Sequence, residues 1–301
     1  MRITREVAED LVLQGLAKKN MVIHPVLGEL TLFKYARSVF YKNLWTPELE
    51  QLRGAVFHGD TLAVQAMLKV YNYGERDAGK DLSMDTPVYL DYKVNGFMLN
   101  VTIIGDELIF STTGSLTSDF VELGASVFFN TLSVRDIEEL KTFEDYTTFT
   151  FEVVHSSDPH IVQEKEGLYL LRISNHSMGL RNRVAEAIKC NPVEGFVTTL
   201  GEALKLAETA KHEGWMVYPA HGFGEPFFKL KTKYYLTTKF LMRSKKASDM
   251  VFKDQWPVED EEFFKLVQAI KDTFSKDSWD GMDDQTRRHF VETFFQDNGA
   301  F

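Results

Sequence analysis

The chain has 301 residues, of which 44% are hydrophobic, and a formal net charge of −10 at pH 7. This length allows one large domain plus a smaller one. The negative charge argues against a general polyanion-binding surface, so any contact with nucleic acid must be local or assisted by metal ions. The single cysteine, Cys190, excludes an internal disulfide and a multi-cysteine metal site. Without an apolar run of the roughly 18 to 20 residues that span a membrane, or a signal-peptide core, we expect a cytoplasmic protein.

Helical and strand patterns alternate along the chain. A helix is predicted where apolar residues recur at helical spacing, and a strand where β-branched or aromatic residues alternate with polar ones. After about residue 240 only helical patterns remain, so we predict an α+β domain over residues 1–240 and a small all-helical domain over residues 241–301. The predicted helices span 4–19, 118–129, 199–212, 259–274 and 284–295, and the predicted strands span 28–35, 53–60, 61–67, 86–90, 97–104, 108–110, 147–154, 168–173, 214–219 and 226–236.

Lys93 lies between two of these predicted strands, and Gly96 follows it three residues later. A compact amine in such a position can reach a bound phosphate, and a lysine among other cations can serve as a nucleophile. Most tetrapeptides of this kind are solvated turns, so the lysine alone indicates little. The nucleophile hypothesis therefore requires that the chain also supply groups for phosphates and for a metal.

Four further cations lie on or beside predicted strands. Lys229 and Lys231 are two residues apart, so a strand places both on one face, where together they can grip one phosphate. Arg53 and Lys69 are single candidates for phosphate contacts. The lysine pair can equally be two solvated lysines on an outer strand, and the pattern alone favours a surface charge for Arg53 and for Lys69, each taken singly.

Two carboxylates are candidate metal ligands, Glu152 and Glu213. Glu152 lies inside an otherwise apolar strand, where a carboxylate is costly unless it is paired or binds a ligand. Glu213 directly precedes the strand 214–219 and is joined to the lysine pair by one hairpin-length connection. Glu194 has a similar local sequence, but a predicted helix separates it from the lysine pair, so we choose Glu213. Carboxylates without a His or Cys cluster favour Mg²⁺ or Mn²⁺.

Seven short motifs occur between about residues 30 and 236. Their order and spacing resemble the covalent nucleotidyltransferases, the superfamily of ATP-dependent ligases and mRNA-capping enzymes, and most of all the phage RNA ligase 1 (tRNA-repair) family. The resemblance implies a nucleotidyltransferase (ATP-grasp-like ligase) domain of antiparallel sheets with flanking helices. The motifs are Arg53-Gly54-Ala55-Val56-Phe57, Lys69-Val70-Tyr71-Asn72, Lys93-Val94-Asn95-Gly96, Thr113-Gly114-Ser115, Phe151-Glu152-Val153-Val154, Glu213-Gly214-Trp215-Met216-Val217 and Phe228-Lys229-Leu230-Lys231-Thr232-Lys233-Tyr234-Tyr235.

The resemblance also implies a role for each candidate residue. Lys93 would attack the α-phosphate of ATP and carry AMP, while Lys229 and Lys231 hold that phosphate. Arg53 and Lys69 would contact the other phosphates and orient the pyrophosphate leaving group. The implied nucleotide contacts are Tyr35, Arg53, Lys69, Tyr71, Asn95, Gly96, Glu152, Lys229, Lys231 and Tyr235, and the implied metal ligands are Glu152 and Glu213.

The activity implied by the resemblance is ATP-dependent ligation of RNA ends. The partner is RNA with 5′-phosphate and 3′-hydroxyl ends, single-stranded or in a nicked tRNA loop, and the cofactors are ATP, as AMP donor, and Mg²⁺ or Mn²⁺. A monomer is expected, in the cytoplasm of an infected host cell if the protein is phage-encoded.

Two positions depart from the family's motifs. Asn95 stands where an acid usually precedes the motif glycine, and an amide can bond a ribose hydroxyl but cannot act as a base. Thr113 stands where a basic residue is common, which removes one phosphate contact.

Three other readings remain open. DNA ligases and capping enzymes normally carry an OB-fold after the lysine pair, and the helical patterns after residue 240 count against one here. A non-catalytic RNA-end-binding protein is the third reading, which the presence of Lys93 and the lysine pair disfavours. The helical tail is short for a tRNA-recognising domain, although Arg243, Lys245 and Lys246 at its start are candidates for RNA phosphate contacts.

Overall fold

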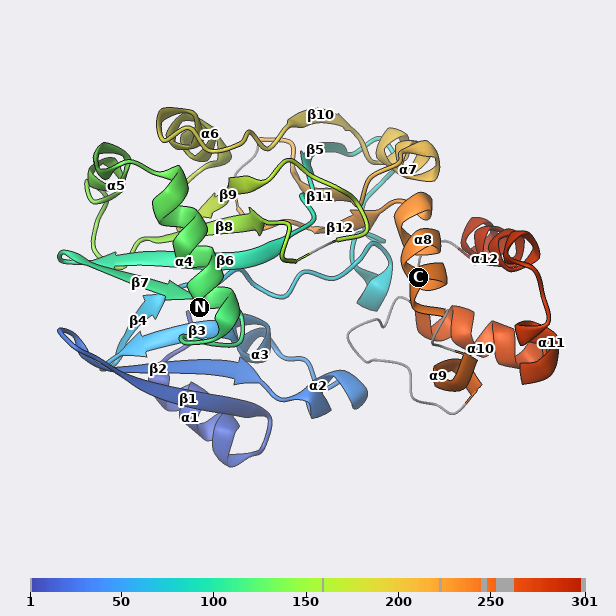
Figure 1. The fold of residues 1–301 in the computed structure, drawn as a ribbon, viewed down its shortest axis with the longest axis horizontal. Helices are drawn as coiled ribbons and strands as arrows, with labels where there is room; N and C mark the ends of the chain where they lie inside the picture. Colours follow the sequence, from blue (N-terminus) through green and yellow to red (C-terminus); the bar gives the residue numbers. More distant parts are fainter. Residues whose placement is uncertain (1, 159, 222–223, 245–247, 253–262, 299–301) are drawn as a thin grey trace. The chain divides into compact units, whose positions relative to one another are not determined.

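The computed structural model describes residues 2–158, 160–221, 224–244, 248–252 and 263–298 (Figure 1). The chain forms two compact units, and each draws on separate stretches of sequence. Unit 1 comprises Met1–Lys69, Val94–Glu194 and Gly222–Glu225, and unit 2 comprises Val70–Lys93, Gly195–His221 and Pro226–Phe301. The predicted boundary near residue 240 does not coincide with this division and stays a prediction.

The first sheet of unit 1 is antiparallel, with strand order β1-β2-β3-β4. The predicted helix over 4–19 is wrong in its second half, because α1 ends at Leu13 and the next residues form a strand. Gly15 has a φ of +72°, which ends the helix, and β1 then pairs with β2 along its whole length. The elements here are α1 (Arg5–Leu13), β1 (Ala17–His24), β2 (Gly28–Tyr35), α2 (Arg37–Tyr41), α3 (Pro47–Gln51), β3 (Arg53–His58) and β4 (Thr61–Val64).

The second sheet of unit 1 has the strand order β7-β6-β8-β9. Helices pack on one of its faces. Ile104 and Ile109 of this sheet share an apolar core with residues of the first sheet. Phe128 of α4 and Val184 of α6 belong to one apolar core with Phe149 and Phe151 of β8, whose seven residues are all buried. The elements are β6 (Phe97–Ile104), β7 (Glu107–Ser111), α4 (Asp119–Thr131), α5 (Val134–Leu140), β8 (Thr148–Val154), β9 (Gly167–Ile173) and α6 (Met178–Ala187).

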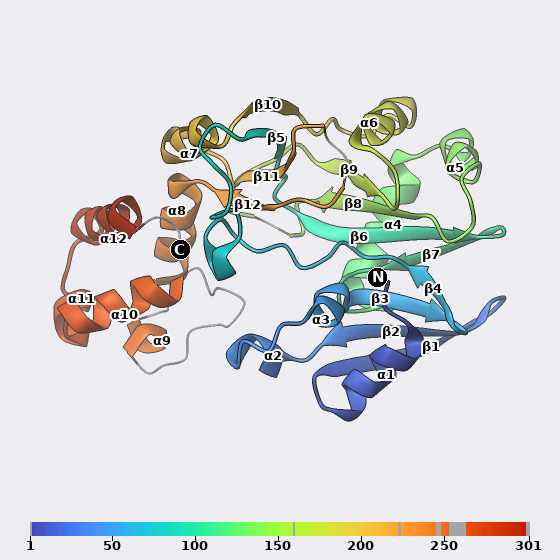
Figure 2. The same ribbon diagram turned by 180° about the vertical axis from the view of Figure 1, so that it is seen from behind.

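Unit 2 contains the third antiparallel sheet, order β10-β5-β11-β12 (Figure 2). One face is apolar and is covered by α7, whose Leu200 and Ala203 pack on Leu90 and Val217. The hydroxyl of Thr199 accepts a hydrogen bond from the amide of Glu202, so Thr199 caps the N-terminus of this helix. The elements are η1 (Glu75–Asp77), β5 (Pro87–Tyr92), β10 (Gly195–Thr199), α7 (Leu200–Thr209), β11 (Gly214–Pro219) and β12 (Phe228–Lys231).

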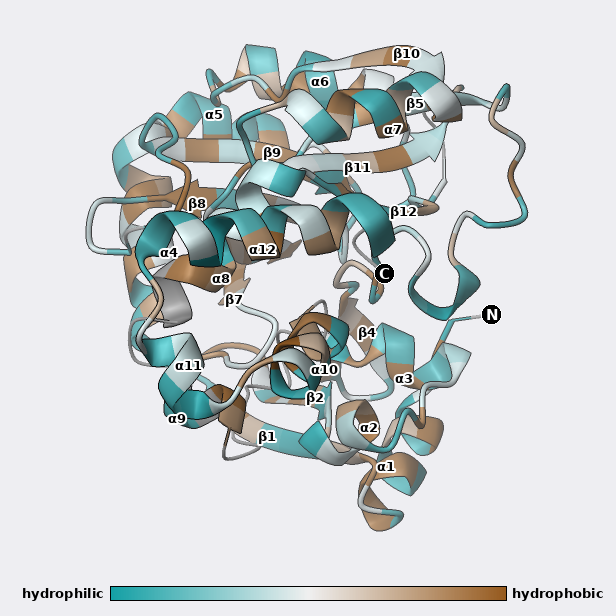
Figure 3. Ribbon diagram, turned by 90° about the vertical axis from the view of Figure 1, so that its right-hand side faces the viewer, coloured by the Kyte–Doolittle hydropathy of each residue, from teal (hydrophilic) through white to brown (hydrophobic). Residues whose placement is uncertain are grey.

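Helices complete unit 2, and Figure 3 shows apolar and polar residues alternating along α12. Phe263 packs against Phe240 of α8 and Phe295 of α12. The predicted strand 226–236 is too long, because it ends at Lys231 and α8 begins two residues later. The helices are α8 (Lys233–Ser244), α9 (Ser248–Phe252), α10 (Phe264–Thr273), α11 (Lys276–Asp280) and α12 (Asp284–Asn298).

Some predictions for this tail fall outside the described residues. These are Lys245, Lys246 and the first residues of the predicted helix over 259–274, and of Arg243 only the backbone is described. The architecture as a whole is the predicted α+β arrangement of antiparallel sheets with flanking helices, and none of the three sheets found in the described residues closes into a barrel. No helix in the described part of the chain is long and apolar enough to cross a membrane.

Candidate active site

Lys93 directly follows strand β5 of unit 2. Its backbone amide donates a hydrogen bond to the carbonyl of Gly214 at 3.0 Å, which extends the pairing of β5 with β11 by one residue. Because β5 lies between β10 and β11, the lysine is attached to an inner strand of the sheet rather than to an open loop. The prediction that Lys93 lies between two strands is confirmed, since β5 ends one residue before it and β6 begins at Phe97.

The amine of Lys93 forms an ion pair with Glu213. Its Nζ lies 2.9 Å from Oε1 of the carboxylate, and the two side chains are 23% and 5% exposed. A buried carboxylate needs such a partner, because desolvation of an isolated charge is costly. Glu194, the alternative considered from the sequence, is exposed and belongs to unit 1. The structure therefore places Glu213, and not Glu194, against Lys93.

Lys229 and Lys231 lie on β12, the strand beside β11. Their neighbours Phe228 and Leu230 belong to the apolar core under α7, so both lysines point to the opposite face of the sheet. This confirms the strand geometry on which the predicted phosphate grip depends. Lys231 stands opposite Gly214 in the register, and Gly214 accepts the hydrogen bond from Lys93, so the three positions form a row across three strands.

Gly214 is a glycine because the strands approach closely at this point. Its φ is +137°, and a Cβ atom there would meet the carbonyl oxygen of Leu230 and would lie 2.8 Å from Cα of Lys231. Any side chain would therefore push β12 away from β11. The glycine holds the strand that carries the lysine pair close to the strand that follows Glu213.

Tyr71 and Tyr235 lie beside the lysine pair. The carbonyl of Tyr71 accepts the amide of Lys229 at 2.7 Å, so the segment around Tyr71 extends the sheet beyond β12. The ring centroid of Tyr235 lies 5.7 Å from Nζ of Lys231 and 5.9 Å from Nζ of Lys239. Lys239 was missed by the sequence reasoning, although its helical spacing of four residues from Tyr235 indicates the contact.

Asp91 is a second residue that the sequence reasoning missed. It lies on β5 two residues before Lys93, is 3% exposed, and stands in register with Met216, which is itself opposite Lys229. Cross-strand neighbours share a face, so this buried acid lies on the face of the sheet that carries the lysine pair. The rule that selected Glu152, an acid inside an otherwise apolar strand, would also have found Asp91.

Glu152 and Gly96 come together in unit 1. Glu152 lies on the buried strand β8, is 7% exposed, and its Oε1 accepts a hydrogen bond from the amide of Gly96 at 3.1 Å. A Cβ atom at Gly96 would meet the carbonyl of Val153 and would lie 3.1 Å from Cγ of Glu152. The glycine of the lysine motif is therefore required for close packing against β8.

Asn95 offers an unused hydrogen-bond donor in unit 1. The side chain is 5% exposed, and within the described part of the chain its Nδ2 has no hydrogen-bond partner. A buried donor of this kind is costly unless a ligand supplies the acceptor. A ribose hydroxyl supplies such an acceptor, so Asn95 fits a nucleotide.

Arg53, Lys69 and Tyr35 form another group in unit 1. Nη1 of Arg53 donates to the carbonyl of Leu68 at 3.0 Å, directly before Lys69 in the chain. Nζ of Lys69 lies 4.6 Å and 5.3 Å from the ring centroids of Phe40 and Trp45. The Tyr35 ring packs on the same two rings, so an aromatic cluster holds Lys69 and Tyr35, and the hydrogen bond to Leu68 keeps Arg53 next to them.

His212 is a histidine that lies beside the unit 2 site. Burial between the rings of Tyr92 and Trp215, at 4.7 and 4.5 Å, lowers the pKa of this histidine. Its Nδ1 accepts a hydrogen bond from the amide of Gly214 at 3.1 Å, which requires the neutral ring.

The predicted metal ligands belong to different units, Glu152 to unit 1 and Glu213 to unit 2. The described residues contain no group of three or more His, Cys, Asp or Glu side chains that could hold a metal ion. Both side chains are carboxylates, the ligand type that Mg²⁺ and Mn²⁺ prefer.

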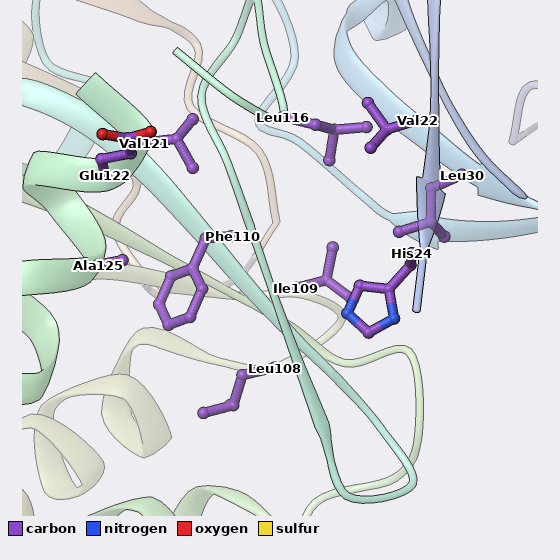
Figure 4. Close-up of a pocket in the computed structure, with 10 residues that line it drawn as sticks. All are labelled: Val22, His24, Leu30, Leu108, Ile109, Phe110, Leu116, Val121, Glu122 and Ala125. Carbon is purple, nitrogen blue, oxygen red and sulfur yellow. The ribbon is translucent and has the colours of Figure 1, made fainter. Parts of the chain in front are cut away.

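A cavity of about 250 Å³ in unit 1 contains none of the predicted site residues (Figure 4). It lies among β1, β2, β7 and α4, and its walls are mostly aliphatic and aromatic. Its polar residues, His24 and Glu122, offer no permanent positive charge, so the cavity does not fit a triphosphate. Its lining residues are Val22, His24, Leu30, Leu108, Ile109, Phe110, Leu116, Val121, Glu122 and Ala125.

Comparisons with known proteins reveal a shared fold. No model of a known protein family matches the chain. An Aquifex aeolicus protein assigned as an ATP-dependent DNA ligase aligns with a TM-score of 0.59 at 13% identity, over 97% of this chain and 80% of the other. Two forms of an archaeal ATP-dependent RNA ligase align with TM-scores of 0.57 and 0.56 at 13% and 12% identity, over 96% of this chain and 75% of each of theirs. The chain therefore has the α+β fold of these ligase structures.

Proposed function

We propose that this protein is an ATP-dependent RNA ligase that joins 5′-phosphate and 3′-hydroxyl RNA ends through AMP carried on Lys93. The observation that carries the proposal is the arrangement across β5, β11 and β12. Lys93 is held against the buried carboxylate of Glu213, and Lys229 and Lys231 lie on one face of β12. The shared fold with ligase structures supports the same conclusion.

In the first step, Nζ of Lys93 attacks the α-phosphorus of ATP. A nitrogen–phosphorus bond forms, the bond to the bridging oxygen breaks, and pyrophosphate leaves. The amine must lose a proton, and the carboxylate of Glu213, 2.9 Å away, is the nearest acceptor that the structure describes. Lys229 and Lys231 stabilise the charge that develops on the α-phosphate oxygens.

In the second step, an oxygen of the RNA 5′-phosphate attacks the same phosphorus and Lys93 leaves with a proton regained. In the third step, the RNA 3′-hydroxyl attacks the 5′-phosphate and loses its proton to solvent, while the pyrophosphate P–O bond breaks and AMP leaves. Charge stabilisation is the main requirement of each transfer, so the same cations serve all three.

Residues of unit 1 supply several of the proposed nucleotide contacts. The buried Nδ2 of Asn95 bonds a ribose hydroxyl, and Arg53 and Lys69 contact the outer phosphates. Glu152 and Glu213 are the carboxylates that would hold Mg²⁺ or Mn²⁺, and a bound ion would neutralise phosphate charge. We propose Tyr35, Tyr71 and Tyr235 as aromatic contacts and RNA with a broken strand, such as a nicked tRNA loop, as the partner.

To test this, the full chain is incubated with Mg²⁺ and α-labelled ATP, or with α-labelled GTP in parallel. The protein is then denatured, and the label that it retains is measured. Wild-type protein is expected to retain AMP and Lys93→Met to retain none. Lys80→Met is the matched control, because Lys80 is an exposed lysine of the same unit, paired with Asp77. Absence of label on well-folded wild-type protein would overturn the enzyme proposal and favour an RNA-end-binding protein.

The adenylated protein is then offered 5′-phosphorylated RNA or DNA strands. Sealing of RNA alone is expected. Sealing of DNA alone would replace the proposed substrate with DNA, and label from GTP but not from ATP would indicate capping chemistry.

A further inference from the structure

Helix α2 of unit 1 and the turn after it present an exposed aromatic ring. Tyr41, the last residue of α2, is 66% exposed, more than any other Phe, Tyr or Trp side chain among the described residues. Leu44, three residues later, is 40% exposed. A tyrosine ring that stands in water can stack on a flat partner such as a nucleobase. The groups around the ring must then identify which partner it fits.

The backbone around Tyr41 is closed by hydrogen bonds. The amide of Leu44 donates to the carbonyl of Val39 at 3.0 Å. Asn43, with a φ of +51°, ends the helix in the left-handed conformation that asparagine tolerates. Because Tyr41 belongs to this ordered turn, a partner can bind it without the cost of first folding a loop.

The segment around Tyr41 is basic, although the chain as a whole carries a net charge of −10. Residues 30–47 include Lys34, Arg37 and Lys42 and no Asp or Glu. Arg37 and Lys42 are exposed, and Arg37 precedes Tyr41 by four residues, which places the two on one face of the helix. A chain of this net charge needs a local basic surface to bind nucleic acid, and α2 combines one with an exposed ring.

Helix α2 also lies beside the nucleotide contacts that unit 1 is proposed to supply. The ring of Phe40, next to Tyr41 in the chain, packs on the ring of Tyr35 with centroids 5.3 Å apart. The same ring lies 4.6 Å from Nζ of Lys69. A strand of nucleic acid bound at Tyr41 is therefore held next to the part of unit 1 that contacts ATP in the proposed function.

We infer that Arg37, Tyr41 and Lys42 bind single-stranded RNA, with one base stacked on the tyrosine ring and the adjoining phosphates beside the two cations. This inference rests on the proposed function, and it assigns a surface to the RNA partner. Every base has a π-face, so this contact accepts ends of any sequence. Bases in a duplex are already stacked on one another, so duplex RNA does not offer the contact.

The test is fluorescence anisotropy of a labelled, 5′-phosphorylated single-stranded RNA titrated with the full chain, as wild type, Tyr41→Ala, Tyr41→Phe and Phe129→Ala. Phe129 is the matched control, because it is a 53% exposed ring of the same unit on α4, a helix without Lys or Arg. We expect Tyr41→Ala to weaken RNA binding about tenfold, as loss of one stacked base does. Tyr41→Phe and Phe129→Ala should stay within about twofold of wild type, and thermal unfolding verifies that each variant folds.

The variant Lys42→Met tests the phosphate contact. The slope of the logarithm of RNA affinity against the logarithm of salt concentration should become shallower by about 0.7, the change expected when one phosphate contact to a single strand is lost. A slope equal to that of wild type would overturn the placing of a phosphate beside Lys42. Duplex RNA of the same sequence should compete only weakly, and competition equal to that of the single strand would overturn the stacked base.

Unchanged RNA binding in the Tyr41→Ala protein would overturn the inference, and so would equal losses in the Tyr41→Ala and Phe129→Ala proteins. Label transfer from ATP to Lys93 of the wild-type protein separates this result from the proposed function. Tyr41-dependent RNA binding without label transfer supports the RNA surface and not the ligase. Label transfer together with RNA binding that does not depend on Tyr41 supports the ligase and not this surface.

Discussion

The ion pair between Lys93 and Glu213 predicts a strong and asymmetric energetic coupling. At a separation of 2.9 Å the two charges attract by about 6 kcal/mol with an effective dielectric constant of about 20, before the cost of their desolvation. Lys93→Met leaves a carboxylate buried without its partner, so we expect the free energy of unfolding to fall by about 3 kcal/mol. Glu213→Gln leaves an amine that is 23% exposed and can reach water, so the expected loss is smaller, about 1.5 kcal/mol.

The double variant, Lys93→Met with Glu213→Gln, contains no unpaired charge at this site. We expect it to lose less stability than the two single variants together, with a coupling energy of about 2 kcal/mol. The measurement is a double-mutant cycle by urea unfolding, followed by tryptophan fluorescence and far-UV circular dichroism so that two-state behaviour is tested.

An exposed ion pair of the same unit provides the control for this cycle. Lys205 and Glu202 lie 2.8 Å apart on α7, but their side chains are 74% and 58% exposed. Solvent screening makes the coupling of such an exposed pair small. A coupling at Lys93 and Glu213 no larger than that of this control would refute the reasoning, because burial would then contribute nothing to the pair.

Three further predictions concern single residues of the two units. Gly214→Ala should destabilise the protein by about 3 kcal/mol or more, because the new Cβ atom meets Leu230 and Lys231 at a positive φ, and urea unfolding measures this loss. Burial lowers the pKa of His212, so below pH 6.5, the ordinary pKa of a histidine, the unfolded chain binds more protons than the folded chain. The free energy of unfolding should therefore decrease as the pH falls below about 6.5. A pH dependence that is the same in wild type and His212→Gln would contradict this. Burial raises the pKa of Cys190 to about 12, so its thiol should react with a disulfide reagent at pH 8 only slowly until urea unfolds the chain.

Sequence patterns determined the parts of the site that depend on near neighbours. The spacing of Lys229 and Lys231 predicts a shared face on any strand, because side chains alternate there with a period of two. The apolar surroundings of Glu152 predict a buried carboxylate with a hydrogen-bond partner, and the structure supplies the amide of Gly96. The α+β class follows in the same way from local alternation and helical spacing.

Errors arose where local pattern and long-range pairing disagreed. Residues 17–19 continue a helical pattern, but their backbone groups pair with β2 across the turn that ends at Gly28. The strand pattern after Lys231 is overridden because the hydroxyl of Thr232 accepts the amide of Tyr235 and begins α8. In both cases hydrogen bonds decided the boundary and propensity did not.

Only the tertiary structure decided which charges meet. Lys93 and Glu213 are far apart in the chain, and they form an ion pair because β5 pairs with β11 in one register. Asp91 comes to lie on the lysine-bearing face through the same kind of pairing. Short-range spacing determines the face on which a side chain lies, whereas backbone hydrogen bonds between distant strands and the burial of their apolar faces determine its neighbours.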